Sequence, residues 1–161
     1  MKLTRRENLA LMGAAAVTAA AGTARAEAKT IEVQMLNVHP EEKRERQVFY
    51  PAVVRANVGD TIKFISVDKG HNATTHDDMV PDGGETWKSK INDDFEITLT
   101  ADGTYGYFCT PHQTVGMVGL ILVGDAMVNF EDARGVRQRG KAKARYEAYF
   151  AEAEEMLAGE A

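Results

Sequence analysis

The chain has 161 residues, of which 44% are hydrophobic and 27% are charged, and its formal net charge is −5. That length suits one ordinary domain, and the average composition excludes collagen-like, low-complexity and wholly disordered proteins. The acidic balance argues against a nucleic-acid binder, which needs a basic face, and the single cysteine excludes an intramolecular disulfide and cysteine-rich zinc or iron–sulfur sites.

Residues 1–26 have the anatomy of an export signal. A basic start that includes Arg5 and Arg6 precedes an alanine-rich apolar stretch at 9–22 and an A-x-A cleavage site at 24–26. That stretch is too short to span a bilayer as a helix. The paired arginines favour twin-arginine export of a folded protein, and an ordinary secretion signal is the alternative. Cleavage after residue 26 would leave a chain with a net charge of −8 outside the cytoplasm.

Residues 27–126 predict a sandwich of short strands. Alternating apolar and polar residues are typical of half-buried strands, and glycine–aspartate pairs mark the turns between them. The predicted strands cover residues 31–36, 53–55, 61–65, 95–100, 104–109 and 118–123. Seven or so strands at this spacing favour an antiparallel β-sandwich.

Residues 127–161 change to helical patterns. We expect Asn129 to cap a short helix through about Arg137, and Gly140 to break it. A second helix is predicted from Lys141 to about Gly159, because apolar residues recur there at helical spacing. This stripe contains Tyr146, Tyr149, Phe150, Ala153 and Leu157. We expect it to pack on an open face of the sandwich, and a helix that binds a partner is the alternative.

Four residues form a pattern that suits a copper ion. Cys109, His112 and Met117 follow one another as Cys-x2-His-x4-Met at the end of a predicted strand, and His71 lies 38 residues upstream of the cysteine. One thiolate and two imidazoles suit copper in a trigonal plane, with a thioether as a weak axial ligand. This ligand set lets Cu(I) and Cu(II) interconvert with little rearrangement, which favours single-electron transfer.

Each of these residues also has an ordinary explanation, since lone cysteines and methionines often fill cores and lone histidines often lie on surfaces. The agreement of spacing, order and strand context favours the metal. A nucleophilic cysteine–histidine pair, as in thiol hydrolases, is the enzymatic alternative. It fits poorly because Cys109 ends a strand rather than beginning a helix, and no strong orienting acid follows His112.

The sequence resembles the pseudoazurins, a branch of the cupredoxin family, over essentially the whole chain after residue 26. The matching segments are Val38, Pro51-Ala52, Val58–Thr61, Asp68–Asn72, Pro81–Gly83, Lys88–Asn92, Gly106 and Cys109–Gly119. The resemblance implies an all-β, cupredoxin-like Greek-key sandwich with two C-terminal α-helices. It also implies a soluble periplasmic carrier of single electrons, commonly to copper nitrite reductase in denitrifying bacteria. Plastocyanins share the ligand spacing but lack the helical tail, and azurins space the ligands differently.

The same resemblance implies one copper ion with four ligands: His71, Cys109, His112 and Met117. It also implies three supporting residues. The backbone amide of Asn72 would donate to the Cys109 sulfur, and the Asn72 side chain would bond to Thr110. Pro111 would stiffen the ligand loop by removing a backbone donor.

The resemblance further implies that redox partners dock around an exposed edge of His112. We expect this surface to contain Lys69, Lys88, Met79, Pro81 and Val115. Relatives often surround the histidine with lysines, whereas Phe108 stands here where a lysine is usual and Asp77 and Asp78 face the same region. Gln47 replaces a methionine that often packs near the second histidine. These departures weaken the expected docking of an acidic partner and leave the reduction potential open.

We consider three functions: an electron carrier, a copper oxidoreductase and a copper-storage protein. The sequence favours the electron carrier, which is not an enzyme. A copper oxidoreductase would need a further site with several histidines, and only His39 and His76 remain, both expected on the surface. A copper-storage protein would use several methionines or cysteines at a flexible site, whereas Met35, Met79 and Met127 are scattered. We expect a periplasmic monomer without a membrane span that meets redox proteins such as nitrite reductase or c-type cytochromes, and no nucleic acid.

Overall fold

The computed structural model describes residues 27–160, so the predicted export signal lies outside the described residues. The strands in chain order are β1 (Thr30–Val38), β2 (Arg46–Tyr50), β3 (Val53–Ala56), β4 (Thr61–Ile65), β5 (Thr74–Thr75), β6 (Phe95–Thr98), β7 (Gly103–Phe108) and β8 (Val118–Val123). The α-helices are α1 (Phe130–Gly135) and α2 (Lys141–Ala158). Three short 3-10 helices are η1 (Asp77–Met79), η2 (Thr110–Val115) and η3 (Ala126–Val128).

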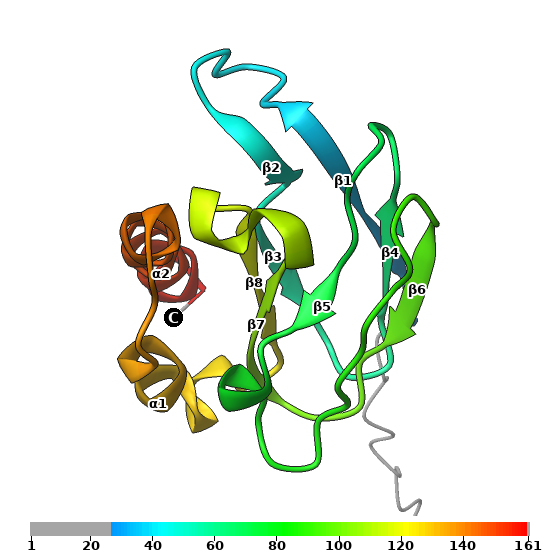
Figure 1. Ribbon diagram of the computed structural model, residues 1–161. Helices are drawn as coiled ribbons and strands as arrows, with labels where there is room; N and C mark the ends of the chain where they lie inside the picture. The colour runs from blue at the N-terminus through cyan, green and yellow to red at the C-terminus, as the bar shows by residue number, and fades with distance from the viewer. Residues whose placement is uncertain (1–26, 161) are drawn as a thin grey trace, which may run out of the picture.

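The strands form two four-stranded sheets that pack face to face (Figure 1). Their orders are β2-β1-β4-β6 and β3-β8-β7-β5. The prediction of an all-β sandwich with two C-terminal helices is confirmed, but the prediction of a purely antiparallel one is wrong. β1 pairs with β4 and β3 pairs with β8 in parallel. The chain crosses between the sheets before it returns, so strands that run in the same direction become neighbours.

All six predicted strands occur within two residues of their expected bounds, whereas β2 and β5 were not predicted. β2 follows a charged loop, and its second residue, Gln47, has a left-handed backbone with φ 54°. β5 has only two residues, so it cannot display an alternating pattern. These two strands matter because β2 and β5 lie on either side of the end of the sandwich that carries η2 (Figure 1).

β8 is buried along its whole length because both of its faces are covered. Ile121 and Val123 point into the core between the sheets, whereas Leu120 and Leu122 point toward the helices. Successive side chains of a strand alternate between faces, so a continuous apolar run is what such a doubly covered strand requires. β8 therefore joins the sandwich core to a second core beneath α1 and α2.

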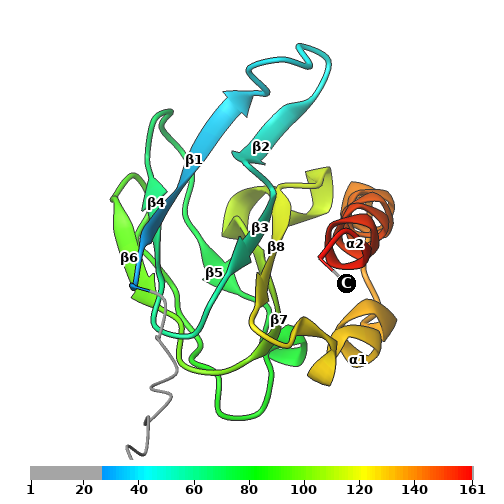
Figure 2. The same ribbon diagram turned by 180° about the vertical axis from the view of Figure 1, so that it is seen from behind.

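The two α-helices cover the outer face of the sheet that contains β7 and β8 (Figure 2). Tyr146, Phe150 and Ala153 of α2 are buried there, while Tyr149 and Leu157 lie at the edge of the contact. The predicted packing of the apolar stripe is thus observed. No helix within the described part of the chain has the length and apolar character that a membrane crossing requires.

The short helix begins directly after Asn129, as predicted, but it ends earlier and lacks the predicted side-chain cap. α1 ends at Gly135 rather than near Arg137, and Asn129 precedes it without forming a side-chain cap. The Asn129 side chain instead accepts a hydrogen bond from the Thr104 amide at 2.7 Å and donates to the Thr104 carbonyl at 2.9 Å. Asn129 therefore ties the start of α1 to β7, which local sequence cannot reveal.

Candidate metal centre

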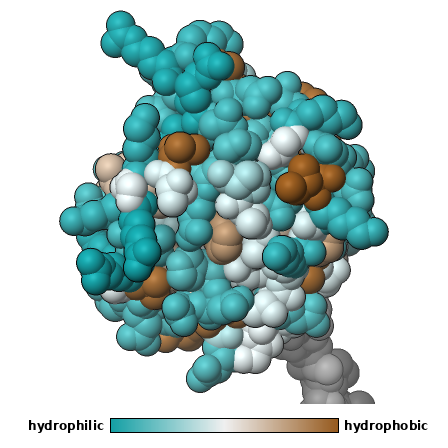
Figure 3. Space-filling model, in the orientation of Figure 1, coloured by the Kyte–Doolittle hydropathy of each residue, from teal (hydrophilic) through white to brown (hydrophobic). Residues whose placement is uncertain are grey.

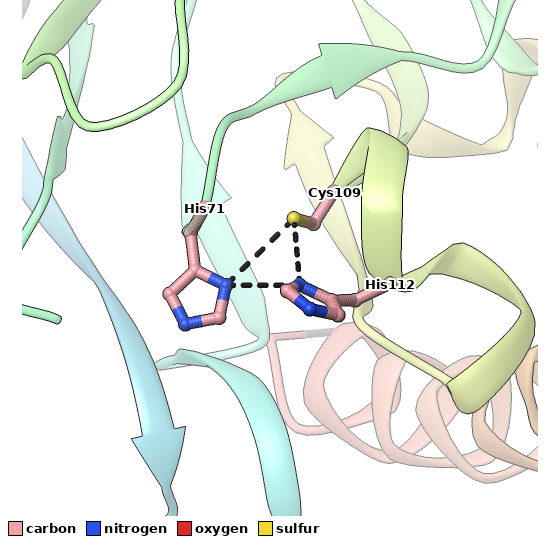
Figure 4. Close-up of side chains that lie close together, drawn as sticks. All are labelled: His71, Cys109 and His112. Carbon is pink, nitrogen blue, oxygen red and sulfur yellow. Dashed lines mark hydrogen bonds between the residues drawn. The ribbon is translucent and has the colours of Figure 1, made fainter. Parts of the chain in front are cut away.

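Three separate segments bring His71, Cys109 and His112 together at one end of the sandwich (Figure 4). Cys109 directly follows β7, His112 lies in η2, and His71 lies between β4 and β5. The Cys109 Sγ atom is 3.8 Å from Nδ1 of His71 and 3.4 Å from Nδ1 of His112. The two Nδ1 atoms are 3.1 Å apart. Within residues 27–160, no other cluster of three His, Cys, Asp or Glu side chains converges in this way.

The spacing of these three donor atoms fits a single metal ion. The point equidistant from the three atoms lies about 2.0 Å from each, close to a metal–nitrogen bond and slightly below a metal–sulfur bond. A soft thiolate with two imidazoles is a donor set that suits copper. The three side chains are therefore placed so that one such ion could contact all three donor atoms.

Burial sets the protonation of the site. Cys109 and His71 are fully buried, and His112 is half-buried. Burial raises the pKa of the Cys109 thiol, and backbone N–H groups of Asn72 and His112 act in the opposite direction. Burial, and then the neighbouring His112, lower the pKa of His71, whereas Asp68 opposes them. Neutral imidazoles can donate a lone pair to a metal, and a bound cation stabilises the thiolate.

Asn37, in β1, orients His71. The Oδ1 atom of Asn37 lies 3.0 Å from Nε2 of His71. A proton on Nε2 donates to this oxygen, which leaves the Nδ1 lone pair directed at Cys109 and His112. Such a bond from the second ring nitrogen is usual for metal-binding histidines. Sequence reasoning missed Asn37, because a polar residue near the end of a strand carries no distinguishing signal.

Asn72 connects the segment that carries His71 to the segment that carries Cys109. Its Oδ1 accepts a hydrogen bond from the Thr110 amide at 2.8 Å, and its Nδ2 donates to the Thr110 hydroxyl at 3.1 Å and to the Ser89 carbonyl at 3.1 Å. The predicted bond between Asn72 and Thr110 is thus present. Because Thr110 follows Cys109 and Asn72 follows His71, these bonds fix the position of the Cys109 sulfur relative to the His71 imidazole.

Backbone hydrogen bonds fold the ligand loop back on itself. The Cys109 amide donates to the Met117 carbonyl at 2.9 Å, and the Met117 amide donates to the His112 carbonyl at 3.0 Å. Pro111 stands in the first turn of η2, where a missing amide costs nothing. Gly116 turns the chain with φ 98°, a left-handed value that favours glycine. Met117 is fully buried beside Cys109 as a result.

Arg145, from α2, clamps this loop from outside. Its guanidinium donates to the carbonyl oxygens of Gly116 at 2.7 Å, Gln47 at 2.8 Å and Arg46 at 2.9 Å, and it pairs with Glu45. The loop and β2 are thereby joined to the C-terminal helix. Sequence reasoning missed this role, because Arg145 resembles the other charged residues of α2.

The structure corrects two of the five residues predicted for partner docking. Met79, the last residue of η1, is 1% exposed and packs against Gly106 of β7. Pro81 is buried against Gly103, at the opposite end of β7 from Cys109. Neither can touch a partner, because β7 separates Pro81 from the site and neighbouring side chains cover Met79. Lys69, Lys88 and Val115 are exposed, as predicted.

The two remaining histidines lie apart from the cluster. His76 lines a surface hollow together with Asp77, Asp78, Lys88 and Phe108, so the predicted proximity of the two aspartates to Phe108 is observed. Burial lowers the pKa of His76, against the opposing effect of Asp78 and Asp77. His39 packs edge-on against Tyr50. Both histidines are half-buried rather than fully exposed.

Comparisons with known proteins agree with this donor set. A family model described as copper-binding proteins of the plastocyanin/azurin family matches residues 36–124. Over 141 residues the chain is 43% identical to a pseudoazurin of Paracoccus pantotrophus, covering 88% of this chain and 95% of the relative. A pseudoazurin of Methylorubrum extorquens is 39% identical over 144 residues, with 89% and 95% covered. The structure of a Sinorhizobium pseudoazurin superposes with a TM-score of 0.75 at 43% identity, covering 78% of this chain and 97% of that one.

Proposed function

Because the chain belongs to the plastocyanin/azurin family of copper-binding proteins and, within it, to the pseudoazurins, we propose that it carries single electrons between periplasmic redox proteins. Its cofactor is copper. The proposed acceptor is a copper nitrite reductase of a denitrifying bacterium, and c-type cytochromes are among the proposed partners. The carrier is proposed to act as a monomer and to catalyse no reaction of its own.

Four side chains are proposed to hold the copper ion. Cys109 would bind through Sγ, and His71 and His112 through their Nδ1 atoms, which converge with the sulfur at 3.1–3.8 Å. Met117, buried beside Cys109, would supply a thioether as a fourth, weaker ligand. When bound, copper supplies a one-electron couple between Cu(I) and Cu(II). The convergence of the three donor atoms is the observation that carries this proposal.

Residues around the ligands keep the donor atoms in place through both oxidation states. Asn37 fixes the ring of His71, Asn72 fixes Thr110 next to the thiolate, and Arg145 fixes Gly116 next to Met117. Donor atoms that are already in position need little movement when an electron arrives or leaves. The buried positions of His71 and Cys109 also exclude water from the sulfur. Fast electron transfer follows from this rigidity.

His112 is the proposed route for the electron. It is the half-buried member of the three converging side chains, while His71 and Cys109 are enclosed. Lys69, Lys88 and Val115 provide exposed charge and apolar surface for the proposed docking. Small redox encounters need only a limited contact area.

A visible spectrum of the copper-loaded protein, combined with cyclic voltammetry, tests the function. A carrier with a copper–thiolate bond is expected to show an intense blue absorption band and a reversible one-electron wave. A colourless protein that gives up its copper to a mild chelator would instead indicate copper storage. Turnover of a small substrate by the copper-loaded protein would indicate an oxidoreductase.

The periplasmic location rests on the predicted export signal at residues 1–26, which we propose is read by the twin-arginine pathway. Replacing Arg5 and Arg6 by lysine is expected to trap the precursor in the cytoplasm. Immunoblots of periplasmic and cytoplasmic fractions measure this result. Normal export of the lysine variant would point to the general secretion pathway, with the periplasmic location unchanged.

A further inference from the structure

His71 lies in a loop whose outer edge buries little apolar surface. This loop, residues 66–73, joins β4 to β5, and residues 88–94, which lead into β6, run beside it (Figure 1). The large apolar side chains at the edge of the two segments, Val67 and Ile91, are 51% and 50% exposed. On the face seen in Figure 3, hydrophobic side chains are likewise isolated among hydrophilic ones. Polar bonds between the two segments therefore matter for the position of His71.

The two segments pair in an antiparallel direction and then lose their register at His71. Thr74 and Lys88 form a β-bridge, and continuing this register would place residue 91 opposite His71. The amide that donates to the His71 carbonyl, at 2.9 Å, instead belongs to Asn92. One extra residue is thus accommodated opposite His71, as in a β-bulge. Bulges of this kind redirect a side chain, and they often lie next to functional sites.

The side chain of Asn92 closes this bulge. Its Oδ1 atom accepts a hydrogen bond from the Gly70 amide at 2.6 Å, so Asn92 bonds both the residue before His71 and the carbonyl of His71 itself. Gly70 and Asn92 both have left-handed backbones, with φ 92° and 73°. Glycine adopts this conformation freely, and asparagine adopts it more readily than most residues because its short side chain bonds locally. Position 92 therefore requires both a left-handed backbone and an acceptor oxygen.

Asn92 completes a set of contacts that hold His71 from different sides. Asn37 bonds the ring at Nε2, and Asn72 ties the next residue of the chain to Thr110. Asn92 bonds the backbone to which the ring is attached. Asn92 is exposed whereas His71 is fully buried, so the effect of Asn92 on His71 comes from its hydrogen bonds and not from apolar packing.

We propose that Asn92 is a positioning residue of the metal centre. Through the Gly70 amide and the His71 carbonyl, it holds the Nδ1 atom of His71 at its place beside the Cys109 sulfur. A donor atom held in this way moves little between Cu(II) and Cu(I). This inference rests on the proposed electron-carrier function and adds to it a residue outside the proposed ligands.

Three variants separate the side-chain bond from other effects. Asn92→Gly removes the acceptor oxygen, but glycine tolerates φ 73° and keeps the amide that donates to His71. Asn92→Asp keeps an acceptor oxygen and also tolerates a left-handed backbone. Asp94→Ala is the matched control, because the Oδ1 atom of Asp94 accepts from the Ser66 amide at 2.8 Å. That bond joins the same two segments, but Ser66 is five residues away from His71.

Amide hydrogen exchange tests the contact itself. It is measured by nuclear magnetic resonance on the copper-free and the diamagnetic Cu(I) forms. Asn92→Gly is expected to speed exchange at Gly70 by about tenfold or more, because the Gly70 amide loses its acceptor. Asn92→Asp and Asp94→Ala should leave this rate within about twofold of wild type. Unchanged exchange at Gly70 in Asn92→Gly would overturn the proposal.

Copper affinity and the spectra of the Cu(II) protein test the positioning role. Changes to residues that orient metal ligands typically weaken metal binding by about 10–100-fold. Asn92→Gly is therefore expected to bind Cu(II) on the order of tenfold more weakly in competition with a chelator. Its blue band and the copper hyperfine splitting in electron paramagnetic resonance should both shift. Asn92→Asp should recover the affinity and the spectra, and Asp94→Ala should match wild type.

The same measurements distinguish positioning from a general contribution to stability. If Asn92→Gly only lowered the free energy of unfolding in urea and left the affinity and spectra unchanged, the proposal would be overturned. Equal spectral shifts in Asn92→Gly and Asp94→Ala would also overturn it, because any bond between the two segments would then suffice. A wild-type protein without a blue band would contradict the proposed function, and with it the positioning role. A blue wild type whose Asn92→Gly variant is spectroscopically identical would contradict only the inference.

Discussion

Burial has opposite effects on the pKa values of two proposed copper ligands, His71 and Cys109. It lowers the pKa of His71, which keeps this imidazole neutral and able to bind a metal. It raises the pKa of Cys109, so the free thiol is favoured until a cation arrives. The backbone N–H groups of Asn72 and His112 that point to the sulfur partly offset this rise in the pKa of Cys109. Burial thus favours the neutral, metal-binding form of His71, and a bound cation would favour the thiolate form of Cys109.

At the residue scale, Met117→Leu tests the proposed thioether ligand. We expect the blue colour to remain and the reduction potential to rise, because leucine would remove a weak donor that stabilises Cu(II) without touching the other three proposed ligands. Spectroscopy and cyclic voltammetry measure the two effects. Cys109→Ser is the control, and it should abolish the colour while circular dichroism stays unchanged. Loss of copper from Met117→Leu would mean that the thioether is a principal ligand.

The elements outside the site also determine its geometry. α2 is more than a cover for β8, because Arg145 extends from it to three backbone carbonyls around the ligand loop. The hydroxyl of Tyr146, the next residue, donates to the Tyr107 carbonyl in β7 at 2.9 Å. One helical turn therefore holds both the loop that carries His112 and the strand that delivers Cys109.

Arg145→Ala is expected to lower the free energy of unfolding by about 2–4 kcal/mol, because two part-buried carbonyls and one exposed carbonyl lose a charged donor. Arg145→Lys should recover only part of this loss, since an ammonium cannot reproduce the planar fork of the guanidinium. Urea denaturation measures both values. Lys143→Ala, an exposed change on the same helix, should stay within about 0.5 kcal/mol of wild type. Equal stability of Lys143→Ala and Arg145→Ala would show that the hydrogen bonds of Arg145 do not stabilise the protein.

The Tyr146→Phe substitution is expected to change how the free energy of unfolding depends on pH. Burial raises the pKa of Tyr146 well above its ordinary value of 10.0 in the folded protein. The unfolded chain then releases the proton first, so stability is complete below pH ~10 and is lost as the pH rises above it. Near neutral pH the variant should be about 1–2 kcal/mol less stable, because the Tyr107 carbonyl loses a donor.

The free energies of unfolding of wild type and Tyr146→Phe should draw closer by about 1.4 kcal/mol at pH ~11. Only the wild type loses stability there, because only its unfolded chain has a tyrosine at position 146 that can ionise. Urea denaturation at a series of pH values from neutral to alkaline measures the difference. A constant difference across that series would show that Tyr146 keeps the same pKa in the folded and unfolded states.

On the scale of the whole molecule, charge is unevenly distributed around the half-buried His112. The chain after residue 26 is acidic overall, yet Lys69 and Lys88 are exposed near the site and a second group of cations lies beside α2. Asp77 and Asp78 share a hollow with Lys88, so they partly cancel its field. An acidic protein can therefore carry a locally basic docking surface whose strength depends on salt.

Replacing Lys69 and Lys88 by alanine is expected to slow electron transfer with an acidic partner at low salt, by about two- to fivefold. The salt dependence should be shallower than a complete ring of lysines would give. Second-order rates across an ionic-strength series, for wild type and the double variant, measure this. K29A/K143A is the matched control. Identical rates for all three proteins at every salt concentration would show that these lysines do not guide docking.

Much of this protein can be predicted from local sequence. The alternation of apolar residues located six of the eight strands in the described chain, and helical spacing located α2. The spacing Cys-x2-His-x4-Met, together with an upstream histidine, pointed to the three residues that converge in the structure: His71, Cys109 and His112. These features are readable because strand alternation, helical periodicity and a short loop depend on residues that are near in sequence.

The tertiary structure alone decided what depends on distant segments. It placed β1 beside β4 in parallel, set Asn37 against His71, and brought Arg145 to Gly116. It also buried Met79 and Pro81, which a local pattern cannot distinguish from exposed apolar residues. A side chain's exposure and partners follow from how the sheets and helices pack, and that packing joins residues across many tens of positions. Local periodicity therefore fixes which elements form, while long-range packing fixes which side chains meet.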